Sequence, residues 1–99
     1  MNDEAPLTEA DLDAMQQRVE AASNGPWRSF IEGRDHFGGD NFIRIGGLDD
    51  TEADMYVSRD RTPASAADLD FIANARQDVP RLIAEIRRLR TEHEDSHTD

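Results

Sequence analysis

The fold is decided by residues 27–58, which read WRSFIEGRDHFGGDNFIRIGGLDDTEADMYVS. Three short runs within this stretch are rich in aromatic and β-branched residues: 27–31, 41–45 and 54–58. Each run is too short for a helix and is bounded by glycine and aspartate, which predicts three strands in an antiparallel meander. The connecting loops are long for hairpins, and loops of that kind often carry function.

Alternation along these strands separates two chemically different faces of the predicted sheet. One face collects Trp27, Ile31, Ile43, Ile45, Met55 and Val57. The other face collects Phe30, Phe42, Arg44 and Tyr56. We expect the first face to pack on helices, which leaves an aromatic stripe with Arg44 on the open side. Aromatic residues and arginine anchor protein interfaces, so this stripe is a candidate partner-binding surface. A dimer contact, or a sheet covered on both faces, would explain the same residues.

A helix is predicted before the sheet, over residues 9–22. Leu12, Met15 and Val19 recur at helical spacing, and Thr8 with Asp11 approximates a capping box. The helix is expected to stop at Gly25, which suits a left-handed cap and is followed by proline.

The chain after the sheet is predicted to be helical as well. Ser65 is a signal for a helix start, and apolar residues at helical spacing follow it. A second set of apolar residues at the same spacing follows Pro80. Proline disfavours a continuous helix, so we predict two helices joined at Asp78–Pro80. The expected architecture is one α+β domain over 7–90 with helices on one sheet face, preceded by a loose tail (1–6) and followed by a frayed acidic tail (91–99).

Length and composition limit the function classes. A chain of 99 residues allows one domain with a small core. The absence of cysteine excludes disulfides and thiolate metal sites. No apolar run is long enough to span a membrane, and the acidic N-terminus lacks the apolar region of a signal peptide. We therefore expect a cytoplasmic protein without a cofactor.

Charge gives the strongest indication of a partner. Twenty-two Asp and Glu residues face 11 basic residues, a net charge of -11, and every basic residue is arginine. Such a chain repels phosphate backbones, which argues against direct nucleic-acid binding even though an exposed aromatic sheet would suit RNA. A basic protein partner is favoured instead. Residues 81–90 form a local exception, with four arginines and one glutamate, and self-association through this amphipathic helix is an alternative role.

Two loops supply further candidate partner-binding residues. The first contains Glu32, Arg34, Asp35 and His36, and the second contains Asp49, Asp50, Glu52 and Asp54. Acid–base chemistry in the first loop would lack a nucleophile or a phosphate cradle, and a structural Arg–Asp pair is the competing interpretation. The second loop lacks the calcium-binding EF-hand pattern. It is either a solvated charge run or a docking surface that steers a basic partner.

Residues 93–97 match the zinc-protease motif H-E-x-x-H, with His93 and His97 as ligands and Glu94 as general base. The motif ends two residues before the C-terminus, which leaves no third ligand after it, and its segment has no apolar face to hold it in a cleft. We interpret it as a chance match in a solvated tail and expect no metal site. A zinc hydrolase is a remote alternative.

Three segments together resemble a known family. They are the Ala-Ala-Ser-Asn-Gly-Pro-Trp turn at 21–27, the Glu-Gly-Arg-Asp-His loop at 32–36, and the segment Phe-Ile-Ala-Asn-Ala-Arg-Gln-Asp-Val-Pro-Arg-Leu-Ile-Ala-Glu-Ile at 71–86. This pattern is similar to the "ead"-type accessory proteins of lambdoid phages and their bacterial relatives. The resemblance implies a mobile-element or defence-locus setting and supplies no catalytic residues.

These observations favour a non-enzymatic binding protein. The leading hypothesis is an immunity or inhibitor protein that neutralises a basic toxin, such as a nuclease. The alternative is a phage accessory protein that mimics the charge of DNA against a host defence enzyme. Analogy with small acidic proteins of such loci supports the first hypothesis.

Overall fold

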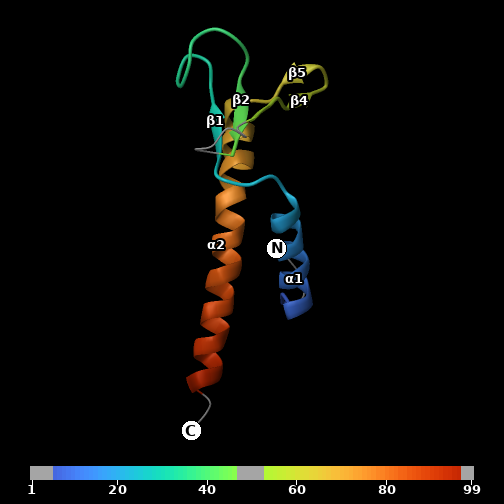
Figure 1. The fold of residues 1–99 in the computed structure, drawn as a ribbon, viewed down its shortest axis with the longest axis vertical. Coiled ribbons are helices and arrows are strands. Elements are labelled where there is room, and N and C mark those ends of the chain that lie inside the picture. The colour runs from blue at the N-terminus through green and yellow to red at the C-terminus, as the bar shows by residue number, and fades with distance from the viewer. Residues whose placement is uncertain (1–5, 47–52, 97–99) are drawn as a thin grey trace.

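A computed structural model describes residues 6–46 and 53–96. Its elements are, in chain order, α1 (Glu9–Ala21), β1 (Trp27–Phe30), β2 (Phe42–Ile45), β3 (Ala53–Met55), β4 (Ser58–Arg59), β5 (Thr62–Pro63) and α2 (Ala66–Ser96). The α+β class is confirmed: β1, β2 and β3 form an antiparallel sheet in that order, between an N-terminal and a C-terminal helix. Figure 1 shows the sheet against the first part of α2, with α1 beside the middle of that helix.

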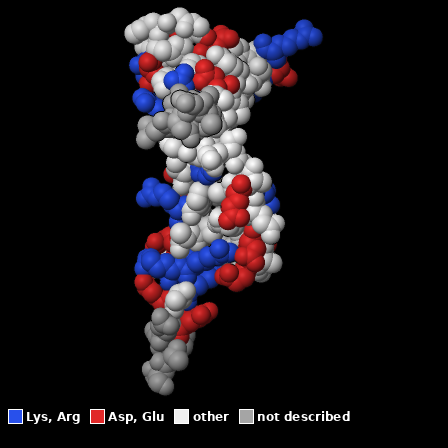
Figure 2. All heavy atoms as spheres, in the orientation of Figure 1, with Lys and Arg blue, Asp and Glu red and all other residues white. Residues whose placement is uncertain are grey.

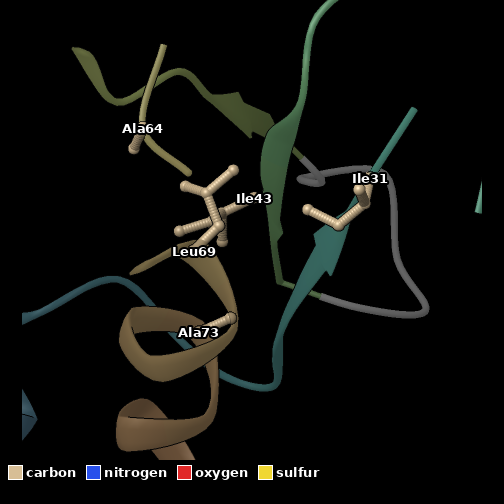
Figure 3. Packing of buried hydrophobic residues seen from close by; sticks show 5 residues of the cluster. All are labelled: Ile31, Ile43, Ala64, Leu69 and Ala73. Carbon is tan, nitrogen blue, oxygen red and sulfur yellow. The ribbon is translucent and has the colours of Figure 1, made fainter. Parts of the chain in front are cut away.

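The core lies between the sheet and the first turns of α2. Ile43, on the central strand, is fully buried, as is Leu69 on the helix. Ile31, Ala64 and Ala73 complete the buried cluster, in which side chains from the strands meet α2 (Figure 3). Burial of this apolar surface is what holds the sheet on the helix.

A single side chain aligns β1 with α2. The Gln77 Oε1 atom accepts a hydrogen bond from the Trp27 amide at 2.7 Å, and its Nε2 atom donates to the Trp27 carbonyl at 3.2 Å. The Gln77 side-chain amide therefore satisfies both backbone groups of Trp27, the first residue of β1. These two bonds orient the edge of the sheet on α2.

The prediction of two C-terminal helices joined at Asp78–Pro80 is wrong. α2 is one helix of 31 residues with Pro80 in its interior. Proline removes one backbone hydrogen bond, but Ala73 before it and Ile83 after it are both buried. A continuous helix keeps both side chains in contact with the rest of the chain, and this packing outweighs the lost bond. The helix also continues through 91–96, part of the segment predicted to fray.

The predicted third strand is divided. β3 ends at Met55, and Ser58–Arg59 pairs instead with Thr62–Pro63 in a small separate hairpin. Its turn residues, Asp60 and Arg61, have φ angles of 50° and 71°. The hairpin was not predicted because a positive φ usually signals glycine or asparagine, and here neither is present.

The start of α1 agrees with the sequence and its end does not. The Asp11 amide donates to Thr8 Oγ1 at 3.0 Å and the Thr8 amide donates to Asp11 Oδ2 at 2.8 Å, which completes the predicted capping box. The predicted left-handed cap at Gly25 is wrong. Ala22 caps the helix in an extended conformation and its amide bonds back to Arg18 and Val19, so no left-handed residue is needed.

The molecule is elongated. Its radius of gyration is 17.7 Å and its principal extents are 62 × 37 × 23 Å. A compact chain of this length has a radius of gyration of about 13 Å. The excess comes from α2, which extends past both the sheet and α1 (Figure 1).

Candidate partner-binding face

The strand register brings the aromatic stripe together on one face of the sheet. Phe30 lies opposite Phe42 across β1 and β2, and Arg28 lies opposite Arg44. Arg44 in turn lies opposite Asp54 of β3. Because Ile43 between Phe42 and Arg44 is buried in the core, these side chains project away from α2.

Ring contacts join the aromatic residues into one row. Phe30 and Phe42 are stacked, with ring centroids 5.2 Å apart and an interplanar angle of 4°. Tyr56 lies 5.6 Å from Phe42, and His36 from the preceding loop lies 5.4 Å from the same ring. Phe30 and Phe42 are half-buried and Tyr56 is exposed, so the row is rigid at one end and accessible at the other.

Two arginines cover one side of this row. The Arg28 guanidinium carbon lies 4.9 Å from the Phe30 ring centroid, and that of Arg44 lies 5.0 Å from Phe30 and 5.5 Å from Phe42. Both are within the range of cation–π attraction. The sequence analysis missed Arg28, although its position two residues before Phe30 places it on the same face.

Arg34 and Asp35, predicted as partner-binding residues, belong to an internal network. Arg34 Nη1 and Nη2 each donate to one oxygen of Asp70 on α2, at 3.0 Å, and Nε donates to Asp35 Oδ2 at 3.0 Å. The Ser29 hydroxyl donates to Asp70, and the Ile31 amide donates to Asp35 at 2.9 Å. The arrangement ties the loop to the sheet and to α2, as the competing structural interpretation described.

This network lowers the pKa of its two carboxyl groups, those of Asp70 and Asp35. Hydrogen bonds from Arg34 and Ser29 lower the pKa of Asp70 to about 2. The hydrogen bond from Arg34, reinforced by the Ile31 amide, also lowers the pKa of Asp35. Ser29 and Asp70 were not predicted as site residues because they lie 41 positions apart in the chain and only the fold brings them together.

Glu32 and His36 hold the rest of the loop. Glu32 Oε2 accepts from the Gly38 amide at 3.3 Å, and the Glu32 amide donates to Asn41 Oδ1 at 2.7 Å. His36 Nδ1 lies 3.1 Å from the Gly38 carbonyl oxygen. Gly38 has a φ of 87°, a conformation that glycine adopts without strain. The loop is thereby positioned with the His36 ring against the aromatic row.

The acidic loop contributes one described residue. Asp54 Oδ1 accepts from Arg44 Nε at 3.1 Å, so that its charge is paired within the sheet. Asp49, Asp50 and Glu52 lie outside the described residues.

Three arginines toward the C-terminal end of α2 are paired with carboxylates. Arg87 Nη2 lies 2.7 Å from Asp13 and Arg90 Nη1 lies 3.0 Å from Glu9, which joins α2 to α1. Arg88 contacts Glu85 and Glu92 on its own helix. Figure 2 shows the result on one face of the molecule, where acidic and basic side chains lie side by side over both the sheet end and the helices.

Neither a metal centre nor a membrane segment is found in the part of the chain that the structure describes. Residues 6–46 and 53–96 contain no group of three His, Asp or Glu side chains arranged to hold a metal ion, and His97 lies outside them. Among the same residues, no helix combines the length and the apolar character needed to cross a bilayer.

Comparison of the chain with protein-family models, with curated proteins and with solved structures found no match. The resemblance to the "ead"-type proteins therefore stays a prediction. The candidate site is defined by its geometry alone.

Proposed function

We propose that this protein is a non-enzymatic binding protein whose docking surface is the open face of the β1–β2–β3 sheet. The observation that carries the proposal is the row of aromatic rings in contact, flanked by Arg28 and Arg44, on a sheet face directed away from α2. Aromatic and arginine side chains that stand together are the usual anchors of protein interfaces.

The rigidity of the row supports this role. Phe30 and Phe42 are already stacked and the two arginines are already in place over their rings, so a partner would immobilise few free side chains on binding. An interface built from ordered anchors loses less conformational entropy than one built from mobile ones. The Arg34–Asp70 network supports it indirectly, because it fixes the loop that carries His36.

The partner class follows from charge. With a net charge of -11, the chain attracts a cationic protein over long distances and thereby raises its association rate. We infer a basic protein partner, and an immunity or inhibitor protein for a basic toxin such as a nuclease is the specific form of the proposal. Mimicry of DNA would call for carboxylates arrayed along one face. The face drawn in Figure 2 carries acidic and basic side chains side by side.

The test purifies the protein from its native host together with its bound partner, identifies that partner and assays it for nuclease activity. Excess wild-type protein is expected to suppress the activity, and undiminished activity would contradict the proposal. Tyr56→Ala is expected to raise the inhibitory concentration about 30-fold, because an exposed aromatic residue that becomes buried as an interface anchor contributes about 2 kcal/mol. Arg28→Ala should act in the same direction, while Arg61→Ala, which removes an exposed arginine of the β4–β5 hairpin, should have no effect.

A further inference from the structure

α2 carries an apolar seam at heptad spacing, and only its first member, Ile72, also packs on the core under the sheet. Its members follow each other at alternate steps of three and four residues, namely Ile72, Ala75, Val79, Leu82, Ile86, Leu89 and His93. Leu82 and Leu89 remain 59% and 50% exposed, and Phe71 beside the seam is 76% exposed. Large apolar side chains in a line on one helix mark a surface that packs against another helix.

The seam is continuous with open apolar depressions at both of its ends. Ile72, Ala75 and Val79 line a groove of about 440 Å³ together with Met15 and Val19 of α1. Ile86, Leu89 and His93 line a second one of about 330 Å³ toward the C-terminal end of α2. Leu82 lies between them along the helix, so the surface spans the distance from residue 72 to residue 93, about 30 Å.

The residue types along the seam select one kind of helix pairing. The first position of three successive heptads holds a β-branched residue in Ile72, Val79 and Ile86, and His93 takes the next one. The fourth position holds leucine in Leu82 and Leu89. β-Branched residues at the first position with leucine at the fourth favour a parallel two-stranded coiled coil.

The charges that flank the seam favour the same arrangement. On one flank lie Asp78, Glu85 and Glu92. On the other lie Arg76, Ile83 and Arg90, of which Ile83 is buried and Arg90 binds Glu9 of α1. In a parallel pair each flanking residue meets the residue five positions later on the other helix. Glu85, which contacts Arg88 on its own helix, would then come near Arg90 of the second copy, which binds Glu9 of its own α1. In an antiparallel pair, equivalent flanks face each other, and the acidic flank would meet its own kind.

We propose that a second copy of this chain docks on the seam, forming a parallel α2–α2 coiled coil over residues 72–93 in which Ile72, Val79, Leu82, Ile86 and Leu89 meet their counterparts. The two sheets would then lie at the same end of the dimer, with both aromatic faces free. The dimer does not depend on the proposed function, because the seam and the aromatic face share no residue.

Sedimentation equilibrium tests the pairing. The wild-type protein is expected at twice its monomer mass of 11.1 kDa, and Leu82→Gln/Leu89→Gln is expected to weaken association about 100-fold or more. Both leucines are exposed in the monomer, so circular dichroism should show an unchanged fold. Ala84→Gln/Thr91→Gln places the same side chains on an exposed part of α2 away from the seam and should leave the dimer intact. A wild-type protein that stays monomeric up to about 1 mM, or a leucine double variant that still dimerises, would overturn the proposal.

Cysteine cross-linking tests the orientation, because the chain contains no cysteine of its own. Leu89→Cys alone is expected to form a disulfide-linked dimer under mild oxidation, since a parallel pair brings residue 89 next to its counterpart. Thr91→Cys, on the far side of the helix, is the matched control and should remain uncross-linked. If cross-links form only between Leu82→Cys and Leu89→Cys chains in a mixture, the helices are antiparallel and the proposed arrangement is wrong.

Discussion

Arg34 joins its own loop to α2 and, through the Ser29 hydroxyl, to β1. Its guanidinium binds Asp70 with two parallel hydrogen bonds and also binds Asp35, one residue along the loop. Paired hydrogen bonds of this kind are stronger and more directional than single ones. The loop that presents His36 to the aromatic row is therefore held by charge and geometry, since the loop itself has no buried apolar side chain between residues 32 and 40.

The pKa of Asp70 predicts a loss of stability in acid. The folded state lowers this pKa from 3.8 to about 2, so the unfolded chain binds the proton more tightly. The stabilising contribution is present above pH 3.8 and is lost as the pH falls toward about 2. Thermal unfolding followed by circular dichroism across this interval should show a falling melting temperature, and Asp70→Asn should make the fall shallower.

A double-mutant comparison separates this network from general acid effects. Arg34→Gln should flatten the same part of the pH profile, because it removes the group that lowers the pKa of Asp70. The Arg34→Gln/Asp70→Asn double variant should lose less stability than the sum of the two single variants, since both single variants already lack the shared Arg34–Asp70 interaction. Fully additive losses in the double variant would show that the two residues act separately.

At the scale of elements, α2 organises the molecule. Its first turns cover the sheet through Leu69 and Ala73, and its middle binds α1 through Arg87 and Arg90. Acidic residues of α1 thus pair with arginines from the locally basic stretch of α2 between residues 81 and 90. The continuity of this helix through Pro80 is what places the sheet and α1 on the same scaffold.

Pro80 is predicted to weaken the helix that contains it. Replacing it by alanine restores a backbone donor to the carbonyl of Arg76, and alanine is favoured over proline in a helix interior by about 3 kcal/mol. Part of this gain is offset by the greater freedom of the unfolded chain, so Pro80→Ala should raise the free energy of unfolding by about 1–2 kcal/mol. Urea denaturation measures the change, and Ala84→Gly, in the same helix, should lower stability by about 1 kcal/mol. A less stable Pro80→Ala protein would mean that packing of the half-buried ring matters more than the missing bond.

The whole molecule depends on a small core. Ile43, Leu69 and Leu12 are the largest side chains that are fully buried among the described residues, and they lie in two places, under the sheet and between the helices. An elongated chain of this size buries less surface than a compact one, so each core residue carries a larger share of the stability.

Ile43→Ala should therefore be severe. Removing a fully buried isoleucine usually costs about 2–5 kcal/mol, and small domains have about 5–15 kcal/mol in total. We expect the midpoint of urea denaturation to fall sharply, or the cooperative transition to disappear. Phe37→Ala is the control, because this ring is 85% exposed and its removal should change stability by less than about 0.5 kcal/mol. Equal effects of the two substitutions would contradict the assigned core.

Local features of this protein could be predicted from sequence. Thr8 and Asp11 are three residues apart and cap α1 as expected, and alternation assigned Phe30, Phe42 and Tyr56 to one sheet face. The spacing of apolar residues along the helices and strands could also be recognised in the sequence, because each spacing follows from the geometry of a few consecutive residues. Of the candidate site, the aromatic row was predictable for this reason.

The tertiary structure alone decided the features that join distant residues. Pro80 argues locally for a break, but the burial of Ala73 and Ile83 on either side keeps α2 whole. Arg34 and Asp35 read as an exposed charged pair until the fold brings Asp70 beside them. In both cases the deciding free energy comes from contacts between segments far apart in the chain, and such contacts leave no pattern within any single stretch of sequence.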